Sequence, residues 1–435
     1  MRIAVIGTGI SGSLAARLLS TRHEVTVWEA SSTAGGHANT VDVSVAGRDF
    51  PVDTGFMVFN RRTYPNFCRL LELLDISSQP SDMSFSVRCS RTGTEYQGSS
   101  LNGLFAQRLN AVRPSFMRML RDIRRFNFQG SAAAASGELS DGRTVGEFLE
   151  QCRVGPKFVT HYLVPMAAAI WSAKPRAILE FPAEFMIGFF ANHGLMQLRH
   201  RPQWRTIVGG SRNYVAALLE PLRDRVRLCC PVASVTRTES HVSVVPTGGL
   251  AEQFDHVVFA SHADQTLKML TDATPRERQI LGAFPYQPND AVLHTDTSLL
   301  PNRRRAWASW NYHIPRDETA AASVTYQLSR LQAHDSARPI LLTLNETSSI
   351  DPAKILRTFR YDHPSYSCDS IVAQRRWSEI SGHRRTLFCG AYWGYGFHED
   401  GVNSALAVAR HFDIELEACT VASTREPLPI AAAGR

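Results

Sequence analysis

The first thirty residues carry the feature that most constrains the fold of this chain. Residues 2–6 (RIAVI) form an apolar strand that runs into the turn GTGISG at 7–12, and a small-residue helix follows at 13–20. A second strand, EVTVW at 24–28, ends directly on Glu29. The order strand, glycine turn, helix, strand and acid is that of a dinucleotide-binding βαβ unit.

Each glycine of this unit, the helix N-terminus and the final acid have a physical role in binding a dinucleotide. Gly7 permits the tight turn, Gly9 lets a pyrophosphate approach the backbone, and Gly12 allows the helix to pack closely on the strand. The helix N-terminus offers unpaired N–H groups and a partial positive charge to phosphates. Glu29 is placed to accept hydrogen bonds from ribose hydroxyls, and a purely structural glycine turn would not need it. The segment therefore predicts a dinucleotide site.

A second glycine pair decides which dinucleotide is favoured. Gly35-Gly36-His37 follows Glu29, and Asp53-Thr54-Gly55-Phe56 follows a short interval later. This arrangement resembles the N-terminus of the flavin-containing amine oxidase superfamily, which includes monoamine oxidases, protoporphyrinogen oxidase and phytoene desaturases. The resemblance implies FAD as the cofactor, in preference to NAD.

The C-terminal part resembles the same superfamily. Residues 386–390 read as a buried strand ending in Gly390, and a small-residue helix opens at Gly401. In relatives this helix N-terminus faces the flavin, where its dipole stabilises negative charge. Relatives usually carry an acid after the strand glycine, but this chain has Ala391. The ribityl contact of that acid is expected to be lost or taken over by Glu399 or Asp400.

The resemblance implies a set of cofactor contacts spread over the chain. They are Gly7, Gly9, Ile10, Ser11, Gly12, Glu29, Ala30, Gly35, Gly36, His37, Thr54, Gly55, Phe56, Met57, Val232, Gly390, Glu399, Gly401 and Val402.

The implied fold class is α/β, a Rossmann-like FAD-binding domain of the amine oxidase type interleaved with an α+β substrate-binding domain. The FAD-binding domain is expected to comprise 1–65, 205–270 and 383–415, the substrate-binding domain 66–204 and 271–382, and a partly disordered tail 416–435. Within the substrate-binding domain, the alanine-containing stretch 130–142 is typical of a flexible surface loop.

Composition sets further bounds. With 435 residues, 44% of them hydrophobic, the chain can bury a large core in two lobes. No apolar run approaches twenty residues, so we expect no transmembrane helix. The chain enters a strand at once, so we expect no secretory signal. Its eight cysteines show neither C-x-x-C pairs nor metal-ligand spacing, which favours a cytoplasmic protein with reduced thiols and no metal site.

The net charge of +7 is partly concentrated in one predicted helix, residues 114–126. Its apolar face carries Phe and Met side chains, and Arg118, Arg121 and Arg125 lie opposite. Such a helix could lie on an anionic membrane surface, peripheral to the bilayer. It could equally be a domain helix with its apolar side in the core and its arginines solvated. Arg303-Arg304-Arg305 could add to the same basic patch. No recognised nucleic-acid module accompanies the charge, so nucleic acid is a poor alternative.

Four motifs narrow the resemblance, namely 35–42, 53–60, 307–312 and 394–401. They resemble a bacterial subgroup of FAD proteins, some of which act in fatty acid modification, and are similar to the flavin-dependent desaturase of furan fatty acid synthesis. This implies dehydrogenation of a fatty acyl chain, methyl-branched and phospholipid-linked, by hydride transfer to flavin N5. Two alternatives remain open: an amine or other small-molecule oxidase using oxygen, and a flavin-bound lipid-binding subunit without turnover. Oligomeric state is equally open.

Two histidines are candidate catalytic residues. His398 lies three residues before Gly401, where amine oxidase relatives place an aromatic beside the flavin, and an imidazole there could act as a general base. The alternative is that His398 only packs on the ring system or hydrogen-bonds it. His294 is a second candidate base. The candidate substrate-wall residues, with structural packing as the equal alternative, are Trp310, Tyr312 and Tyr395.

Overall fold

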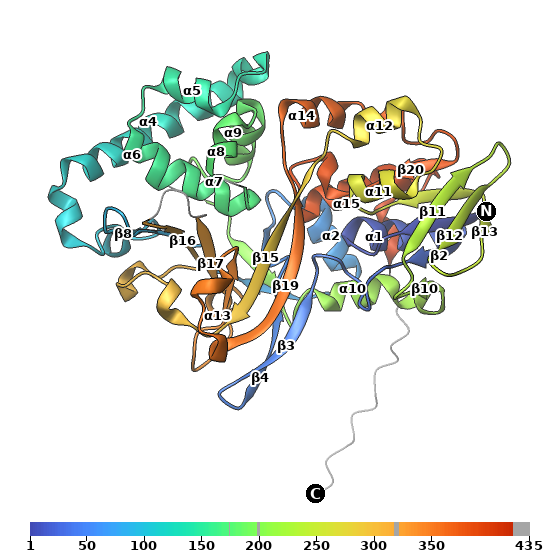
Figure 1. The fold of residues 1–435 in the computed structure, drawn as a ribbon, viewed down its shortest axis with the longest axis horizontal. Helices are drawn as coiled ribbons and strands as arrows, with labels where there is room; N and C mark the ends of the chain where they lie inside the picture. The colour runs from blue at the N-terminus through green and yellow to red at the C-terminus, as the bar shows by residue number, and fades with distance from the viewer. Residues whose placement is uncertain (174, 198–200, 317–321, 421–435) are drawn as a thin grey trace, which may run out of the picture.

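The computed structural model describes residues 1–173, 175–197, 201–316 and 322–420, and Figure 1 shows them arranged in two lobes. One lobe is built on a parallel sheet with helices α1 and α15 beside it. The other consists of a mixed sheet with a group of helices, α4 to α9, lying along it (Figure 1).

The parallel sheet has five strands in the order β10-β2-β1-β14-β20, and every neighbouring pair is parallel. The strands are β1 (Arg2–Ile6), β2 (Glu24–Trp28), β10 (Val226–Arg227), β14 (His256–Phe259) and β20 (Thr386–Phe388). Buried on both faces, β1 needs the continuous apolar run that its sequence has. Since the strand order reverses at β1, the crevice outside its carboxyl end is where a dinucleotide binds in such sheets.

Helices α1 (Ile10–Leu19), α10 (Arg212–Leu219) and α15 (His398–Arg410) pack together in this lobe. An antiparallel three-stranded sheet, formed by β11 (Val232–Arg237), β12 (Val242–Pro246) and β13 (Glu252–Phe254), completes this lobe. A hairpin of β3 (Thr40–Val45) and β4 (Arg48–Asp53) instead buries its apolar side chains in the core of the second lobe.

The second lobe is built on a seven-stranded sheet in the order β19-β15-β18-β17-β16-β7-β8. Its strands are β7 (Phe85–Cys89), β8 (Thr94–Gln97), β15 (Tyr286–His294), β16 (Trp310–Ile314), β17 (Ser323–Gln327), β18 (Leu341–Leu344) and β19 (Ile355–Pro364). Its helices are α3 (Leu101–Leu104), α4 (Pro114–Ser136), α5 (Val145–Cys152), α6 (Pro156–Phe158), α7 (Val164–Trp171), α8 (Pro175–Glu180) and α9 (Ala183–Asn192). Helices α4 to α9 and this sheet share one hydrophobic core. A small sheet, β5 (Phe59–Asn60), β9 (Trp204–Ile207) and β6 (Ser78–Pro80), joins chain segments far apart in sequence.

The strands of the parallel sheet all come from 1–65, 205–270 and 383–415, but several helices cross the expected domain boundaries. Helix α2 (Pro65–Leu73) packs in the same core as α1 and α15, although the sequence assigned it to the substrate-binding domain. Helices α12 (Pro275–Leu281) and α14 (Cys368–Arg375) likewise contribute buried side chains to the core beside β14 and β20. A helix buries its apolar stripe against whichever sheet lies nearest in space, and sequence order does not specify which sheet that is.

Two other boundaries differ from expectation. The alanine stretch continues α4 as far as Ser136, and Gly137 ends the helix with a left-handed φ of 73°, so the predicted loop at 130–142 is wrong over its first half. Alanine is the strongest helix former, which explains the extension. Residues Leu416–Cys419, expected in the tail, form a turn whose Leu416 and Cys419 are buried. The rest of the predicted tail, 421–435, lies outside the described residues.

Candidate functional site

The glycine turn at the end of β1 leaves space where a ligand could approach the backbone. A Cβ atom on Gly9 would have no atom within 4 Å, whereas a Cβ on Gly12 would lie 2.0 Å from the Gly7 carbonyl oxygen. Gly9 is also the N-cap of α1, and no side chain caps that helix. The N–H groups of Ile10 and Ser11 therefore begin a helix N-terminus suited to an anionic group.

Glu29 closes one side of this turn from the end of β2. Its carboxylate accepts hydrogen bonds from the Thr8 N–H at 2.9 Å, from the Thr8 hydroxyl, and from the Ser31 N–H at 2.8 Å. The Cys230 N–H donates to the Glu29 carbonyl at 2.8 Å, which brings the start of β11 with Val232 to the same edge. Glu29 is half-buried, and Ala30 beside it is exposed.

The glycine pair Gly35-Gly36 lies against the glycine turn at 7–12. A Cβ on Gly36 would be 3.2 Å from the Gly9 Cα, and a Cβ on Gly55 would be 2.3 Å from the His37 carbonyl oxygen. The Phe56 N–H donates to that same carbonyl at 2.7 Å. Segments 35–37 and 54–57, distant from 7–12 in sequence, therefore converge on the glycine turn.

His37 carries an unsatisfied group at this junction. The residue is half-buried, its Nε2 is buried without a hydrogen-bond partner, and desolvation lowers its pKa well below the ordinary value. It lies 5.1 Å from the Tyr361 ring and 5.3 Å from the His363 ring, centroid to centroid. An orphaned buried nitrogen is uncommon in folded proteins and is expected to meet a polar ligand atom.

The C-terminal elements close the other side. A Cβ on Gly401 would lie 2.7 Å from Ile10 Cγ2, so the absence of a side chain lets α15 pack directly on α1. Val402 follows in the buried face of α15, and the Gly390 N–H donates to Ser404 Oγ at 3.0 Å. The open position at Gly9, the uncapped N-terminus of α1, the acid at Glu29 and the orphaned His37 nitrogen together fit an FAD.

The two acids at the start of α15 both accept hydrogen bonds from backbone N–H groups. The Glu399 carboxylate accepts the backbone N–H groups of Asn66 at 3.0 Å and Phe67 at 2.9 Å, at the start of α2. The Asp400 carboxylate accepts the Phe397 N–H at 2.9 Å, and burial raises its pKa to about 7. The contact of Glu399 with the cofactor stays a prediction. Helix α2 has no side-chain cap of its own, and Glu399 supplies one from another element.

His398 lies in an aromatic cluster rather than in an open site. Its ring stacks on Phe56 with centroids 3.4 Å apart, and its Nε2 is 2.9 Å from the Tyr214 hydroxyl. Burial lowers its pKa to about 3, so the imidazole is neutral at physiological pH and a poor proton acceptor. This placement favours the packing alternative over general-base catalysis.

His294 lies at the opposite end of β15 from Tyr286, which stacks on His262 next to the parallel sheet. Its side chain is fully buried, its Nε2 pairs with Thr343 Oγ1 at 2.7 Å, and its Nδ1 accepts the Asp296 N–H at 3.0 Å. With both nitrogens satisfied and no exposure, His294 has no access to a substrate. This placement does not favour the prediction that His294 is a base.

The three candidate wall residues divide into two groups. Tyr312 is buried in the core, and Trp310 packs edge-on against Tyr326 at 4.8 Å with its Nε1 unpaired. Tyr395 lies elsewhere, in a group that we call the junction cluster because it joins the helical lobe to the turn before α15. Its members are Trp171, Phe185, Phe189, Tyr366, Tyr395 and Phe397.

The junction cluster is held by ring contacts between α9 and the 395–397 turn. The Phe185 and Phe189 rings lie 4.9 and 5.4 Å from the Tyr395 ring, and Phe397 stacks on Phe189 at 5.0 Å. Sequence reasoning did not select Tyr366, whose buried hydroxyl has no partner. Tyr366 lies two residues after the end of β19 and outside the flavin motifs, so no sequence signal marked it.

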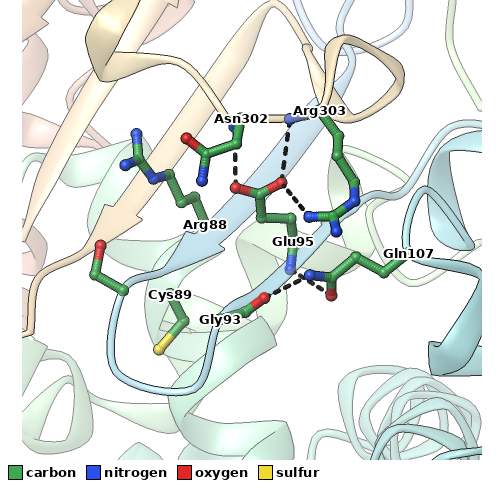
Figure 2. A pocket seen from close by; sticks show the side chains of 8 residues that line it. Arg88, Cys89, Gly93, Glu95, Gln107, Asn302 and Arg303 are labelled. Atoms are coloured by element: carbon green, nitrogen blue, oxygen red, sulfur yellow. Dashed lines mark hydrogen bonds and ion pairs between the residues drawn. The ribbon is translucent and has the colours of Figure 1, made fainter.

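A cavity of about 420 Å³ lies away from these residues at the β7–β8 hairpin (Figure 2). Glu95 organises it, because its carboxylate accepts the N–H groups of Asn302 at 2.9 Å and Arg303 at 3.2 Å and pairs with the Arg303 guanidinium at 3.3 Å. None of the predicted site residues lines this cavity.

All eight cysteines are free. Among the described residues, no group of His, Cys, Asp or Glu is arranged to hold a metal ion. Over the same ranges, every helix is too short or too polar to span a bilayer.

Comparison with known proteins agrees with this geometry. The sequence model of the family described as flavin containing amine oxidoreductase matches residues 10–343. No curated protein matches the sequence significantly.

Solved structures share the fold over nearly the whole chain. A putrescine oxidase bound to putrescine is 15% identical, with a TM-score of 0.67 over 95% of this chain and 99% of that one. Cyclohexylamine oxidase from Brevibacterium oxydans IH-35A is 17% identical, with a TM-score of 0.66 over 95% and 99%. A CLA-producing fatty acid isomerase from P. acnes is 15% identical, with a TM-score of 0.66 over 95% and 98%.

Proposed function

This chain belongs to the flavin-containing amine oxidoreductase family, and from that premise we propose that it is an FAD-dependent dehydrogenase of a fatty acyl chain. Membership of the family makes the protein a flavin-dependent oxidoreductase with FAD as its cofactor. The substrate that we propose is a methyl-branched acyl chain carried on a phospholipid. Bound FAD supplies the hydride acceptor for such a reaction.

The observation that carries the proposal is the chemistry of the junction cluster. Its side chains are aromatic, and they lie between the helical lobe and the first turn of α15. The two carboxylates that follow the cluster in α15 are both occupied by backbone N–H groups, Glu399 at α2 and Asp400 at the Phe397 turn. A third carboxylate, Glu184 next to Phe185, pairs with the Arg375 guanidinium at 2.9 Å. An apolar chain needs only such an apolar wall, whereas an alkylammonium ion is stabilised by a free carboxylate or by open aromatic faces.

The residues of the chain have distinct roles in this proposal. Gly9, the first turn of α1 and Glu29 would hold the dinucleotide, and the orphaned His37 nitrogen would meet a polar atom of the cofactor. The N-terminus of α15 favours negative charge nearby through the helix dipole. Tyr395 and Phe397 would exclude water from an apolar substrate.

The alternative of an amine oxidase is favoured by one observation, the aromatic character of the same cluster. Aromatic faces can bind an alkylammonium ion through cation–π attraction. An amine oxidase would require the rings around Tyr395 to move apart and enclose an alkylammonium ion. The acyl proposal requires the same rings to move apart and form an elongated apolar channel for an acyl chain.

The deciding experiment uses the purified FAD-loaded protein under anaerobic conditions. We expect extracted bacterial phospholipid to bleach the visible flavin absorbance, and putrescine or cyclohexylamine to leave it unchanged. Bleaching by the amines alone would overturn the proposal in favour of an amine oxidase. Bleaching by neither would favour the flavin-bound lipid-binding subunit without turnover, provided that dithionite still bleaches the same sample.

A further inference from the structure

We propose that the outer face of α4, with the turns that precede it, is a docking surface for an anionic phospholipid bilayer. This inference goes beyond the proposed reaction and does not rest on it, because it concerns a surface of the helical lobe and would hold for any substrate.

Helix α4 does not meet solvent with the apolar side that its sequence first suggested. Phe116, Met119 and Phe126 are at most 1% exposed and pack in the core of the helical lobe. That face is therefore unavailable to a membrane. Any contact with a bilayer must use the opposite side of the helix.

The opposite side carries apolar and basic side chains on one stripe. Met117, Arg121, Arg124 and Phe128 follow each other at spacings of four, three and four residues, which places them above one another on a helix. Phe128 is 78% exposed and Met117 is 42% exposed. A Phe side chain this exposed on a domain helix gains free energy when a partner covers it.

The apolar character extends into the residues before the helix. Leu101 in α3 is 76% exposed, and Leu109 and Val112, in the short helix η1 (Arg108–Val112), are 66% and 75% exposed. Of the ten large apolar side chains exposed in the described chain, five lie within residues 101–128. Such concentration in one segment marks an interaction surface, since exposed apolar residues are otherwise scattered singly.

The same segment is strongly basic. Between residues 101 and 128 there are six arginines and a single acid, Asp122. Asp122 is buried and accepts the Gly155 N–H at 3.0 Å, so it does not offset the charge outside. Arg121 and Arg124 are exposed and make no hydrogen bond or ion pair with any described residue.

The loop at 302–305 adds to this surface, and Figure 2 shows which of its arginines is already neutralised. Arg303 pairs with the buried Glu95, so its charge is offset. Arg304 and Arg305 are exposed on the next turn, η6 (Arg304–Ala306), which packs against α3. Arg304 and Arg305 therefore extend the positive surface toward Leu101.

The combination of exposed arginines and exposed apolar side chains indicates which kind of partner this surface binds. Arginines alone would suit any polyanion, but exposed Phe128, Leu109 and Val112 gain nothing from a solvated phosphate backbone. An anionic bilayer satisfies both, because its phosphates attract the arginines and its acyl boundary accepts the apolar side chains. With every described helix excluded as a membrane span, the contact would be peripheral.

The test is co-sedimentation of the FAD-loaded protein with phosphatidylcholine vesicles made with and without phosphatidylglycerol. We expect binding only to the anionic vesicles and weakening with added salt. Arg121→Glu/Arg124→Glu should reduce the partition coefficient by about 100-fold or more, since each charge near the surface contributes about fivefold. Phe128→Ser should reduce it about tenfold.

Matched variants on other surfaces separate docking from general charge or stability effects. Arg22→Glu/Arg225→Glu makes the same charge change at exposed arginines of the FAD-binding lobe, and Leu250→Ser makes the same kind of apolar change at an 88% exposed leucine. Both should bind vesicles like the wild type.

Three outcomes would overturn the proposal. These are no vesicle binding by the wild type, equal binding to neutral and anionic vesicles, and equal loss of binding in the test and control variants. Single-stranded DNA serves as a soluble polyanion probe. If the wild type bound DNA but not vesicles, with Phe128→Ser unaffected, the partner would be a polyanion instead of a bilayer.

Discussion

Two neighbouring acids show how little a residue's type says about its role. Glu399 and Asp400 follow each other at the start of α15, where either could serve the flavin. Each is instead occupied by backbone N–H groups, Glu399 by α2 and Asp400 by the turn at Phe397. His398 beside them is equally committed, to Phe56 and Tyr214. The residue types at the N-terminus of α15 were evident from sequence, but the partners of His398 and Glu399 come from segments more than 180 positions away.

The packing role of His398 can be tested by substitution. His398→Ala should lower the unfolding free energy of the FAD-loaded protein by about 2–4 kcal/mol, because it removes a buried ring and leaves the Tyr214 hydroxyl unpaired. His398→Phe should lose less, since it keeps the stack on Phe56. Chemical denaturation measures both. If His398→Ala kept full stability but lost substrate-driven flavin reduction, the imidazole would regain its role as a base.

At the scale of elements, the glycines of the first βαβ unit separate into two kinds. Gly12 has no room for a side chain because the Gly7 carbonyl oxygen lies against it, whereas Gly9 has open space and an ordinary φ of −57°. The motif predicted both glycines for these reasons, close packing at Gly12 and ligand approach at Gly9. Other elements were less predictable. Glu399 caps the N-terminus of α2, and α4 continues through part of the stretch that was expected to be a loop.

These glycines give a paired prediction. Gly12→Ala should destabilise the protein by several kcal/mol, because its Cβ would lie 2.0 Å from backbone that cannot move independently. Gly9→Ala should fold with nearly unchanged stability but retain little FAD, because the new methyl group enters the cofactor's space. Flavin absorbance per protein and thermal unfolding measure the two effects. Full FAD occupancy in Gly9→Ala would remove Gly9 from the cofactor site.

At the scale of the whole molecule, the interleaving of two lobes buries several histidines at once. Desolvation lowers the pKa of His193, His294 and His363 to about 4 and that of His398 to about 3. His37 is shifted in the same direction. Each of these side chains is neutral in the folded protein but gains a proton in the unfolded chain near pH 6.5.

The resulting pH dependence has a definite sign. Because the folded pKa lies below the unfolded value, the stability linked to each histidine is fully present above about pH 6.5 and is lost as the pH falls toward 4. We expect the urea midpoint to decrease steeply between about pH 7 and pH 5. His294→Gln should flatten that dependence, because it removes one titrating ring. A midpoint unchanged over this interval would contradict the burial of these side chains as neutral groups.

The sequence by itself determined the dinucleotide unit and the family. These depend on contiguous patterns, such as the glycine spacing in 7–12 and Glu29 after β2, which local geometry converts directly into structure. Only the tertiary structure decided that Glu399 caps α2, that His398 packs and His294 is sealed in a strand, and which side of α4 faces solvent. Each of those outcomes depends on which distant segment covers a side chain, and burial against a distant partner leaves no periodic signal in the sequence around it.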